Sequence, residues 1–451
     1  MISRKIETKI DDFFKQNKRK ALLITGARQT GKTYTIRQYG NSHFENFVEI
    51  NFLENKLAAS LFENATDSKT ILLQLSALVD KPLVAGKTLV FFDEVQACKG
   101  IITAIKFLVD EGSYSYILSG SLLGVEMKDI RSIPVGYMDI YDMYPLDIEE
   151  FCKAVGVSND IIESLRSSFN NKTPVNDLIH QKMMDVFRLY LIVGGMPAVV
   201  EKYLQTNNIQ EVINEQKAII ELYKKDISQY DLINKLYLEE IFELIPSELN
   251  SKNKRFILKN LNENFKLSRY ENSFIWFKDA GVALPTYTAK EPTYPLKMSK
   301  ASNLFKLFLS DVGLLASMYM NNIQLQILNK EKNINFGSVY ENVAAQEFKA
   351  HGFDLYYYNS KKNGEIDFLL ERNGEILPIE IKSGKDYTKH SALNNLLSNP
   401  DYSIKEAYVF QNDNIMTKDK ITYFPIYMMM FLENKIVIPD PIYKLDIDIL
   451  K

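Results

Sequence analysis

The sequence predicts an α/β protein: a P-loop core on a mainly parallel, doubly wound sheet, then a helical and winged-helix-like middle, then an α/β C-terminal domain. Two observations predict the core. Short apolar stretches alternate with helical patterns, which favours parallel strands joined by helices. A Gly-rich turn also separates the first apolar stretch from the helix after it. The strands expected in the core are 21–25, 47–52, 88–92 and 114–118.

The remaining chain is divided by changes in pattern. A helical stretch contains Gly194-Gly195-Met196-Pro197, and the last third mixes helix and strand. Asn373-Gly374 has the composition of a tight hairpin turn. The C-terminal elements expected are a helix over 340–350 and strands over 355–358, 366–371 and 376–381. The predicted domains are 1–146 (P-loop core), 147–245 (helical, lid-like), 246–300 (winged-helix-like, basic) and 301–451 (C-terminal α/β).

Composition limits the possible classes of protein. Lys and Arg number 54 and Asp and Glu 57, a net charge of −3, so the chain does not coat nucleic acid by bulk charge. Two cysteines, Cys98 and Cys152, are too few for a disulfide framework, which favours a reducing compartment. The longest apolar stretches are too short to span a bilayer. We therefore expect a cytoplasmic protein with no membrane contact.

The Gly-rich turn matches the phosphate-binding pattern GxxxxGK[ST] at every fixed position, and it follows an apolar strand and precedes a helix. Its glycines let backbone amides surround phosphates at a helix N-terminus. Lys32 is expected to reach the β- and γ-phosphates and Thr33 to ligate Mg²⁺. ATP and Mg²⁺ are therefore the predicted cofactors. The residues of the loop are Gly26, Ala27, Arg28, Gln29, Thr30, Gly31, Lys32 and Thr33.

Acidic and hydroxyl residues follow the third and fourth predicted strands. Asp93 and Glu94 come after an apolar strand, where Asp93 would hold Mg²⁺ and Glu94 would act as general base for hydrolysis. Ser119 and Ser121 follow the next strand and are candidates to touch the γ-phosphate or position the water. Solvated charge for the acids, and a plain turn for the serines, are the alternatives.

A basic stretch over 251–270 contrasts with the acidic chain, because six of its residues are basic and only Glu263 is acidic. A basic helix of a winged-helix fold can lie against DNA phosphates. A solvated basic face, or a face that docks onto another domain, is the alternative. The basic residues are Lys252, Lys254, Arg255, Lys259, Lys266 and Arg269.

An acidic constellation is predicted near the C-terminal hairpin. Asp367 lies on one strand, and Glu380 and Lys382 point to one face of the next, because side chains alternate along a strand. Glu341 lies on the helix upstream. Such carboxylates can hold a divalent metal while a lysine stabilises developing charge, which would cut DNA. An ordinary hairpin end with an acid on each strand is the alternative.

These motifs, with Tyr144-Pro145-Leu146 and Gly194-Gly195-Met196-Pro197, resemble the prokaryotic AAA-type ATPases that carry C-terminal domain of unknown function 4143. The resemblance extends over nearly the whole chain. It implies an AAA-type core, a winged-helix-like middle and a restriction-endonuclease-like C-terminal fold. One departure concerns an arginine: relatives often carry Gly-Arg where this chain has Gly136-Tyr137. Arg131 could serve as the arginine finger instead. The absence of arginine at position 137 argues against a ring in which one subunit supplies an arginine to the next.

We expect a Mg²⁺-dependent ATPase coupled to nucleic-acid binding or processing. The alternative is an ATP-dependent switch that senses a protein partner and keeps a catalytically inactive nuclease-like domain. DNA, a protein partner or self-association are the partners considered. A small-molecule kinase is a weaker third class, because the Asp93-Glu94 pair and the long multidomain chain do not suit it.

Overall fold

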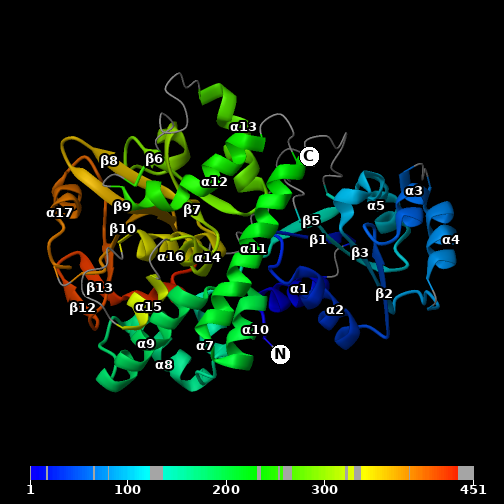
Figure 1. Cartoon of the computed structure of the whole chain (residues 1–451), viewed down its shortest axis with the longest axis horizontal. Helices are drawn as coiled ribbons and strands as arrows, with labels where there is room; N and C mark the ends of the chain where they lie inside the picture. Colours follow the sequence, from blue (N-terminus) through cyan, green and yellow to red (C-terminus); the bar gives the residue numbers. More distant parts are fainter. Residues whose placement is uncertain are drawn as a thin grey trace, which may run out of the picture.

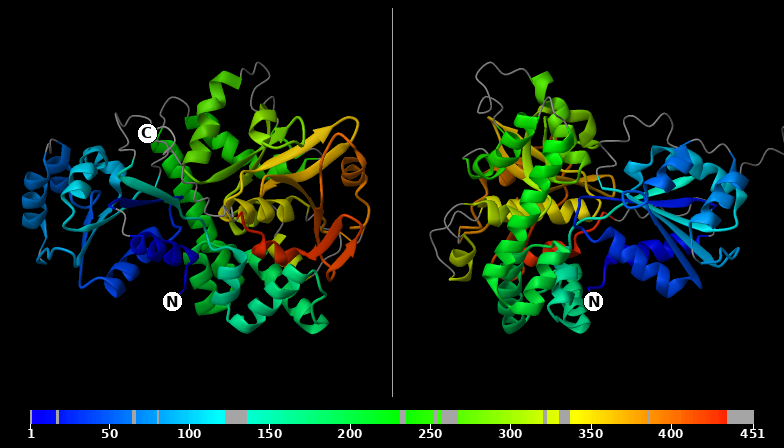
Figure 2. Two further views of the ribbon diagram at one scale, coloured as in Figure 1. Left: turned by 180° about the vertical axis from the view of Figure 1, so that it is seen from behind. Right: turned by 45° about the vertical axis from the view of Figure 1, so that its right-hand side comes forward.

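The computed structural model describes residues 2–16, 19–63, 67–79, 81–121, 136–230, 235–251, 254–256, 267–319, 323–329, 337–384 and 386–434. They form two lobes, each built on its own β-sheet, with the first sheet coloured blue to cyan and the second yellow to red (Figures 1 and 2). Helix α11 (Ile209–Tyr230) lies between the lobes in these views.

The first sheet has five parallel strands in the order β2-β3-β4-β1-β5, which confirms the predicted parallel α/β core. Four strands lie where the sequence predicts them. The edge strand β5 was not predicted, because its alternating polar pattern lacks a continuous apolar stretch. The strands are β1 (Ala21–Thr25), β2 (Asn46–Asn51), β3 (Thr88–Asp93), β4 (Ser115–Ser119) and β5 (Met138–Asp142).

Helices cover both faces of this sheet. Leu89 and Phe91 of β3 pack with α1 and α2, whereas Val90 and Phe92 pack with α3, α4 and α5. A strand buried on both faces is continuously apolar, which explains the sequence of β3. The helices are α1 (Lys5–Lys15), α2 (Lys32–His43), α3 (Lys56–Glu63), α4 (Ser68–Leu78), the 3-10 turn η1 (Val95–Ala97) and α5 (Lys99–Glu111).

The middle helices share one hydrophobic core with the C-terminal part of the chain. Phe187 of α9, Phe277 of α13 and Phe348 of α16 belong to the same buried cluster. The helical region therefore does not stand apart as a separate unit. Besides α11, its helices are α7 (Ile148–Ala154), α8 (Asn159–Asn171), α9 (Asp177–Val193), α10 (Pro197–Thr206), α12 (Lys235–Asn250) and α13 (Leu267–Asp279).

The second sheet is mixed, in the order β12-β13-β11-β10-β9-β8-β6-β7. The hairpin β6–β7 belongs to it, so the predicted division at 300/301 falls at the first residue of β7. Asn373 and Gly374 have φ values of 53° and 77°, as a type I′ hairpin turn requires. The strands are β6 (Ala283–Ala289), β7 (Lys300–Leu309), β8 (Tyr356–Ser360), β9 (Gly364–Arg372), β10 (Glu375–Ile381), β11 (Ala407–Gln411), β12 (Met416–Lys418) and β13 (Ile421–Pro425).

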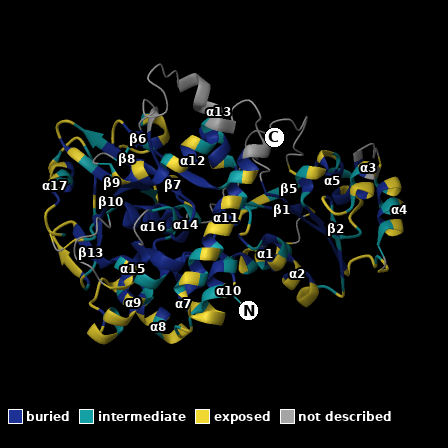
Figure 3. Cartoon of the chain, in the orientation of Figure 1, coloured by how far each residue is buried: buried dark blue, intermediate teal, exposed yellow. Residues whose placement is uncertain are grey.

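Helix α16 lies in the interior of the second lobe, and Figure 3 shows it as almost wholly buried. The other elements of this lobe pack around the sheet. They are η4 (Leu296–Ser299), α14 (Val312–Met318), α15 (Ile323–Leu328), α16 (Gly337–Ala350), α17 (Ser391–Ser398) and η5 (Ile426–Phe431). Within the described residues no single helix is long and apolar enough to cross a membrane, and only the bent pair α9 and α10 passes that test together.

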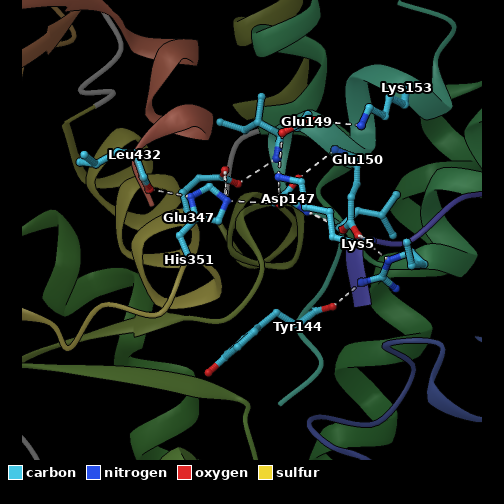
Figure 4. A network of polar contacts seen from close by, with 12 residues as sticks. Lys5, Tyr144, Asp147, Glu149, Glu150, Lys153, Glu347, His351 and Leu432 are labelled. Atoms are coloured by element: carbon cyan, nitrogen blue, oxygen red, sulfur yellow. Dashed lines mark hydrogen bonds and ion pairs between the residues drawn. The ribbon is translucent and has the colours of Figure 1, made fainter. Parts of the chain in front are cut away.

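A buried polar network joins the lobes (Figure 4). Asp147, which caps α7, forms an ion pair with Lys5 Nζ of α1 at 2.7 Å and lies 3.2 Å from Nε2 of His351, the residue after α16. Glu347 of α16 accepts a hydrogen bond from the Ile148 backbone at 2.9 Å. Burial and the Asp147 carboxylate raise the pKa of Glu347 to about 8. Breaking such buried pairs is costly, so they fix how the lobes meet.

Candidate nucleotide site

The P-loop lies at the carboxyl end of β1, where parallel α/β sheets bind ligands. Gly26 and Gly31 have φ values of 136° and 92°, and Gly31 is the N-cap residue of α2. A Cβ atom on Gly26 would lie 2.2 Å from the Met143 carbonyl oxygen, so only glycine fits there. The loop therefore has the compact, amide-rich form that the sequence predicts.

Lys32 is buried beneath this loop. Its Nζ donates to the carbonyl oxygens of Gly26 at 2.9 Å and Ala27 at 2.8 Å. Burial lowers the pKa of Lys32 to about 8, although the nearby Glu94 and Asp93 carboxylates oppose the shift. The ammonium is thus held by neutral carbonyls and not by a carboxylate, and phosphate oxygens would be stronger acceptors for it.

Asp93 is the most heavily bonded acid of the site. Its carboxylate accepts from Thr33 Oγ1 at 3.0 Å, from Asn51 Nδ2 at 3.3 Å and from the Ser119 hydroxyl. The strand order explains this meeting, because β3 lies between β2, which ends at Asn51, and β4, which ends at Ser119. Burial raises the pKa of Asp93, while the Ser119 hydrogen bond opposes the rise. A hydroxyl and a carboxylate side by side suit Mg²⁺, which prefers oxygen ligands.

Glu94 follows directly and adopts a left-handed backbone conformation with φ of 55°. Its Oε2 accepts from the Gln96 side chain and from Ser121 Oγ at 3.4 Å. Among the described residues no cation forms an ion pair with it. A carboxylate without a cationic partner remains able to accept a proton.

The P-loop is also held by residues far away in the sequence. Tyr223 of α11 donates its hydroxyl to the Arg28 carbonyl at 3.0 Å, and Asp226 lies 2.5 Å from Arg28 Nη1. Arg4 Nη1 donates to the Thr30 carbonyl at 2.8 Å. A Cβ atom on Gly281, in the turn between α13 and β6, would lie 2.9 Å from the Ala27 nitrogen. These contacts could not be predicted from the sequence, because no local pattern marks them. Asn51 had a signal, since it lies one residue before the end of the predicted strand 47–52.

Tyr137, which stands where the family resemblance implies an arginine, lies away from this site. Its carbonyl accepts from the Ala21 backbone at 2.8 Å, at the amino end of β1. The P-loop lies at the opposite end of the same strand. The substitute considered from the sequence, Arg131, lies outside the described residues.

The structure brings together the four predicted residues of the C-terminal constellation. Glu341 of α16 and Glu380 of β10 are buried, and Asp367 of β9 is half-buried. Lys382 Nζ lies 3.5 Å from Glu380 Oε1. Burial and the Asp367 carboxylate raise the pKa of Glu380 far above its usual range. The Ile381 backbone N–H donates to Asp367 Oδ2 at 2.8 Å. Burial opposes the shift, but the Lys306 and Lys254 ammonium groups hold the pKa of Asp367 below its usual value.

Two lysines that the sequence analysis did not assign to this constellation neutralise it. Lys306 of β7 is fully buried, with Nζ 3.2 Å from Glu341 and 2.8 Å from Glu365. Lys254 also pairs with Glu341. No three His, Cys, Asp or Glu side chains among the described residues are grouped so as to hold a metal ion. The metal site at Glu341, Asp367 and Glu380 therefore stays a prediction.

The basic stretch is described only in part. Lys254 turns into the acidic constellation, and the Arg255 guanidinium lies 5.9 Å from the centre of the Tyr357 ring. These two contacts are those of a face docked onto another part of the chain. Arg269 lies in α13, but its side chain is not described, and the others lie outside the described residues. These others are Lys252, Lys259 and Lys266.

Comparison with known proteins adds family information. A model described as an AAA domain matches residues 18–152, and models of two domains of unknown function, DUF8612 and DUF4143, match 184–326 and 336–429. An uncharacterized protein of Methanocaldococcus jannaschii is 24% identical over 388 residues, covering 84% of this chain and 77% of that relative.

Two solved structures show distant similarity. The Walker-type ATPase PABY2304 of Pyrococcus abyssi aligns over 70% of this chain and 96% of its own, with a TM-score of 0.42 and 12% identity. The Orc1 protein of Aeropyrum pernix, solved in complex with DNA, aligns over 66% of this chain and 86% of its own, with a TM-score of 0.28 and 12% identity. Together with the P-loop geometry, the domain matches show that residues 18–152 are similar to AAA domains and residues 336–429 to DUF4143.

Proposed function

We propose that this protein hydrolyses Mg²⁺-ATP at the P-loop and uses the nucleotide cycle as a switch on the contact between its lobes. The observation that carries the proposal is the Asp93-Glu94 pair. Asp93 is anchored by donors from neighbouring strands, whereas Glu94 has no ion-pair partner among the described residues. A site that only binds nucleotide needs no such second acid.

The mechanism assigns a step to each residue. Loop amides and Lys32 would bind the phosphates, and Thr33 and Asp93 would hold Mg²⁺. When bound, the metal would neutralise phosphate charge. Glu94 takes a proton from water as the water oxygen bonds to the γ-phosphorus, and the bond from that phosphorus to the β,γ-bridging oxygen breaks.

The switch follows from the enclosure of the loop. Asp226 and Tyr223 of α11 bind Arg28, and Gly281 abuts Ala27, so a change in the loop is felt by both lobes. The lysines at the acidic constellation also favour this alternative over a nuclease. Lys254 and Lys306 occupy the positions beside Glu341 that an electropositive metal would need.

Nucleic-acid processing is the second candidate, with a restriction-endonuclease-like domain as its catalytic part. The convergence of Glu341, Asp367, Glu380 and Lys382 from α16, β9 and β10 favours it. The helices α12 and α13 followed by the hairpin β6–β7 also have the element order of a winged helix, the fold we propose for DNA contact.

One experiment separates the two candidates. Phosphate release by the full chain is measured with and without single-stranded, duplex and branched DNA and RNA, and cleavage is followed in the same Mg²⁺-containing samples. The switch predicts ATP hydrolysis without cleavage and without stimulation. Cleavage that is lost in Asp367→Ala and Lys382→Ala would establish the nuclease instead, and absence of any ATP turnover would refute hydrolysis.

A further inference from the structure

Arg28, the third residue of the P-loop, is held by α11 at both its side chain and its backbone. Its Nη1 lies 2.5 Å from Asp226 Oδ1, and its carbonyl accepts from the Tyr223 hydroxyl at 3.0 Å. Asp226 is buried, with its side chain 8% exposed. A buried carboxylate that keeps its charge needs its cation, so this pairing is specific.

The same guanidinium borders the hydrolytic residues. Arg28 Nε donates to Ser121 Oγ at 3.4 Å, and Ser121 Oγ in turn donates to Glu94 Oε2 at 3.4 Å. On the other side, Lys32 Nζ is bound to the carbonyls of Gly26 and Ala27, the two residues before Arg28. In the proposed mechanism Lys32 binds the γ-phosphate and Glu94 activates the attacking water, so Arg28 lies where transition-state charge would develop.

The Arg28 guanidinium has N–H donors that form no hydrogen bond with the described residues. Nη1 is engaged by Asp226 and Nε by Ser121, while Nη2 has no hydrogen-bond partner among the described residues. Two anchors on one planar group fix its orientation and leave further N–H groups for a phosphate oxygen. Preorganisation of this kind is what makes a charged group effective in a transition state.

We propose that Arg28 is the arginine that stabilises γ-phosphate charge during hydrolysis, supplied by the loop itself, and that Asp226 is the positioning residue that orients it from α11. The inference rests on the proposed ATP hydrolysis. It also explains how the site could work with Tyr137 in place of the arginine that the resemblance implies, because Tyr137 lies at the far end of β1. ATP turnover would then depend on the position of α11, so the contact between the lobes would control the rate of hydrolysis.

The test uses steady-state phosphate release and binding of a fluorescent ATP analogue by the full chain. Arg28→Ala should lower kcat by at least about 100-fold, because arginines in this role contribute about 10³ to 10⁵. Analogue binding should change by no more than about threefold, since the interaction belongs to the transition state. Arg28→Lys, which keeps the charge and loses the planar fork, should still lose about tenfold or more.

Asp226 is tested by a matched pair. Asp226→Asn should lower kcat about tenfold with KM almost unchanged, and Asp226→Glu should recover most of the loss, because only orientation is affected. Arg188→Ala, which removes an arginine paired with Asp185 on α9, is the control and should leave kcat unchanged. Thermal unfolding of each variant separates loss of fold from loss of chemistry.

The outcomes distinguish this inference from the function on which it rests. If Lys32→Ala abolishes turnover while folded Arg28→Ala and Arg28→Lys retain it, the arginine role is refuted and hydrolysis stands. If Asp226→Asn retains full kcat, or if Asp226→Glu is as slow as Asp226→Asn, the positioning role is refuted. If the wild-type chain does not hydrolyse ATP, the proposed function fails first.

Discussion

The two lobes each gather carboxylates and lysines, but they combine them in opposite ways. At the nucleotide site Asp93 is bound by hydroxyl and amide donors, and Lys32 is bound by carbonyls. At the C-terminal constellation the acids are bound by lysines, with Lys306 fully buried against Glu341 and Glu365.

The two sites differ in whether their charged groups are free to interact with a ligand or are already neutralised by a neighbouring residue. Acids and bases that pair with neutral groups keep their charge available, so phosphate and Mg²⁺ gain strong interactions on binding. Acids and lysines that pair with each other have already neutralised their charge, and a ligand would first have to separate them. This difference favours the first lobe as the place of the proposed catalysis and a structural role for the acids and lysines of the second.

The largest expected effect tests the first side of the comparison. Lys32→Ala should reduce ATP turnover by at least about 10³-fold, because both phosphate binding and charge stabilisation are lost. Phosphate release and binding of a fluorescent ATP analogue measure the two losses. Lys418→Ala, at the exposed far edge of the second sheet, is the control. Unchanged turnover in Lys32→Ala would remove the P-loop from the chemistry.

The second side of the comparison concerns stability. Lys306→Met should lower the free energy of unfolding by about 3 kcal/mol, because it removes the cation of Glu365 and leaves Lys254 as the remaining partner of Glu341. The exposed pair Lys405–Glu375 is the matched control, and Lys405→Met should cost no more than about 1 kcal/mol. Urea titration measures both. Equal small losses would mean that the constellation is not held by its lysines.

A smaller expected effect separates binding from chemistry within the first lobe. Glu94→Gln should retain nucleotide binding and lower kcat by about 10²-fold or more, the usual contribution of a general base. Glu163→Gln, on the exposed face of α8, should behave as wild type. Wild-type turnover in Glu94→Gln would assign the base elsewhere.

The smallest expected effect is on pH dependence. The pKa of Lys32 is lowered to about 8 by burial, so the free protein loses this positive charge as pH rises above about 8. ATP binds the charged form, and its KM should therefore rise by up to about tenfold per pH unit above that value. Steady-state kinetics from pH 7 to 9.5 check the slope. A flat KM would mean that Lys32 stays protonated throughout.

The sequence predicted which residues surround the P-loop, because they follow strands whose apolar patterns are readable and the loop motif is contiguous. Asp93 and Ser119 could be placed together once the sheet was taken as parallel. Asp226 could not be found, since it lies 198 residues from Arg28 on a long helix without a distinguishing pattern. Tertiary packing alone brings such pairs together.

The second lobe was harder to predict. Its helix α16 and the strands β8, β9 and β10 were expected, because the Asn373-Gly374 turn marks the hairpin. Strand β6 was assigned to the preceding region, since its sequence does not reveal that Tyr287 pairs with Tyr356 of β8, 69 residues later. Charge counting also could not tell that Lys254 serves an internal carboxylate and not a DNA phosphate.

The close approach of Gly281 to Ala27 has a mechanical consequence. No side chain lies between the two backbones, and close-packed backbone is nearly incompressible. A displacement of the loop by a few tenths of an ångström is therefore passed without slack to the turn before β6, and from there along a strand of the eight-stranded sheet. Because Gly281 has no side chain, a small displacement of the P-loop in the proposed switch would move the second lobe directly.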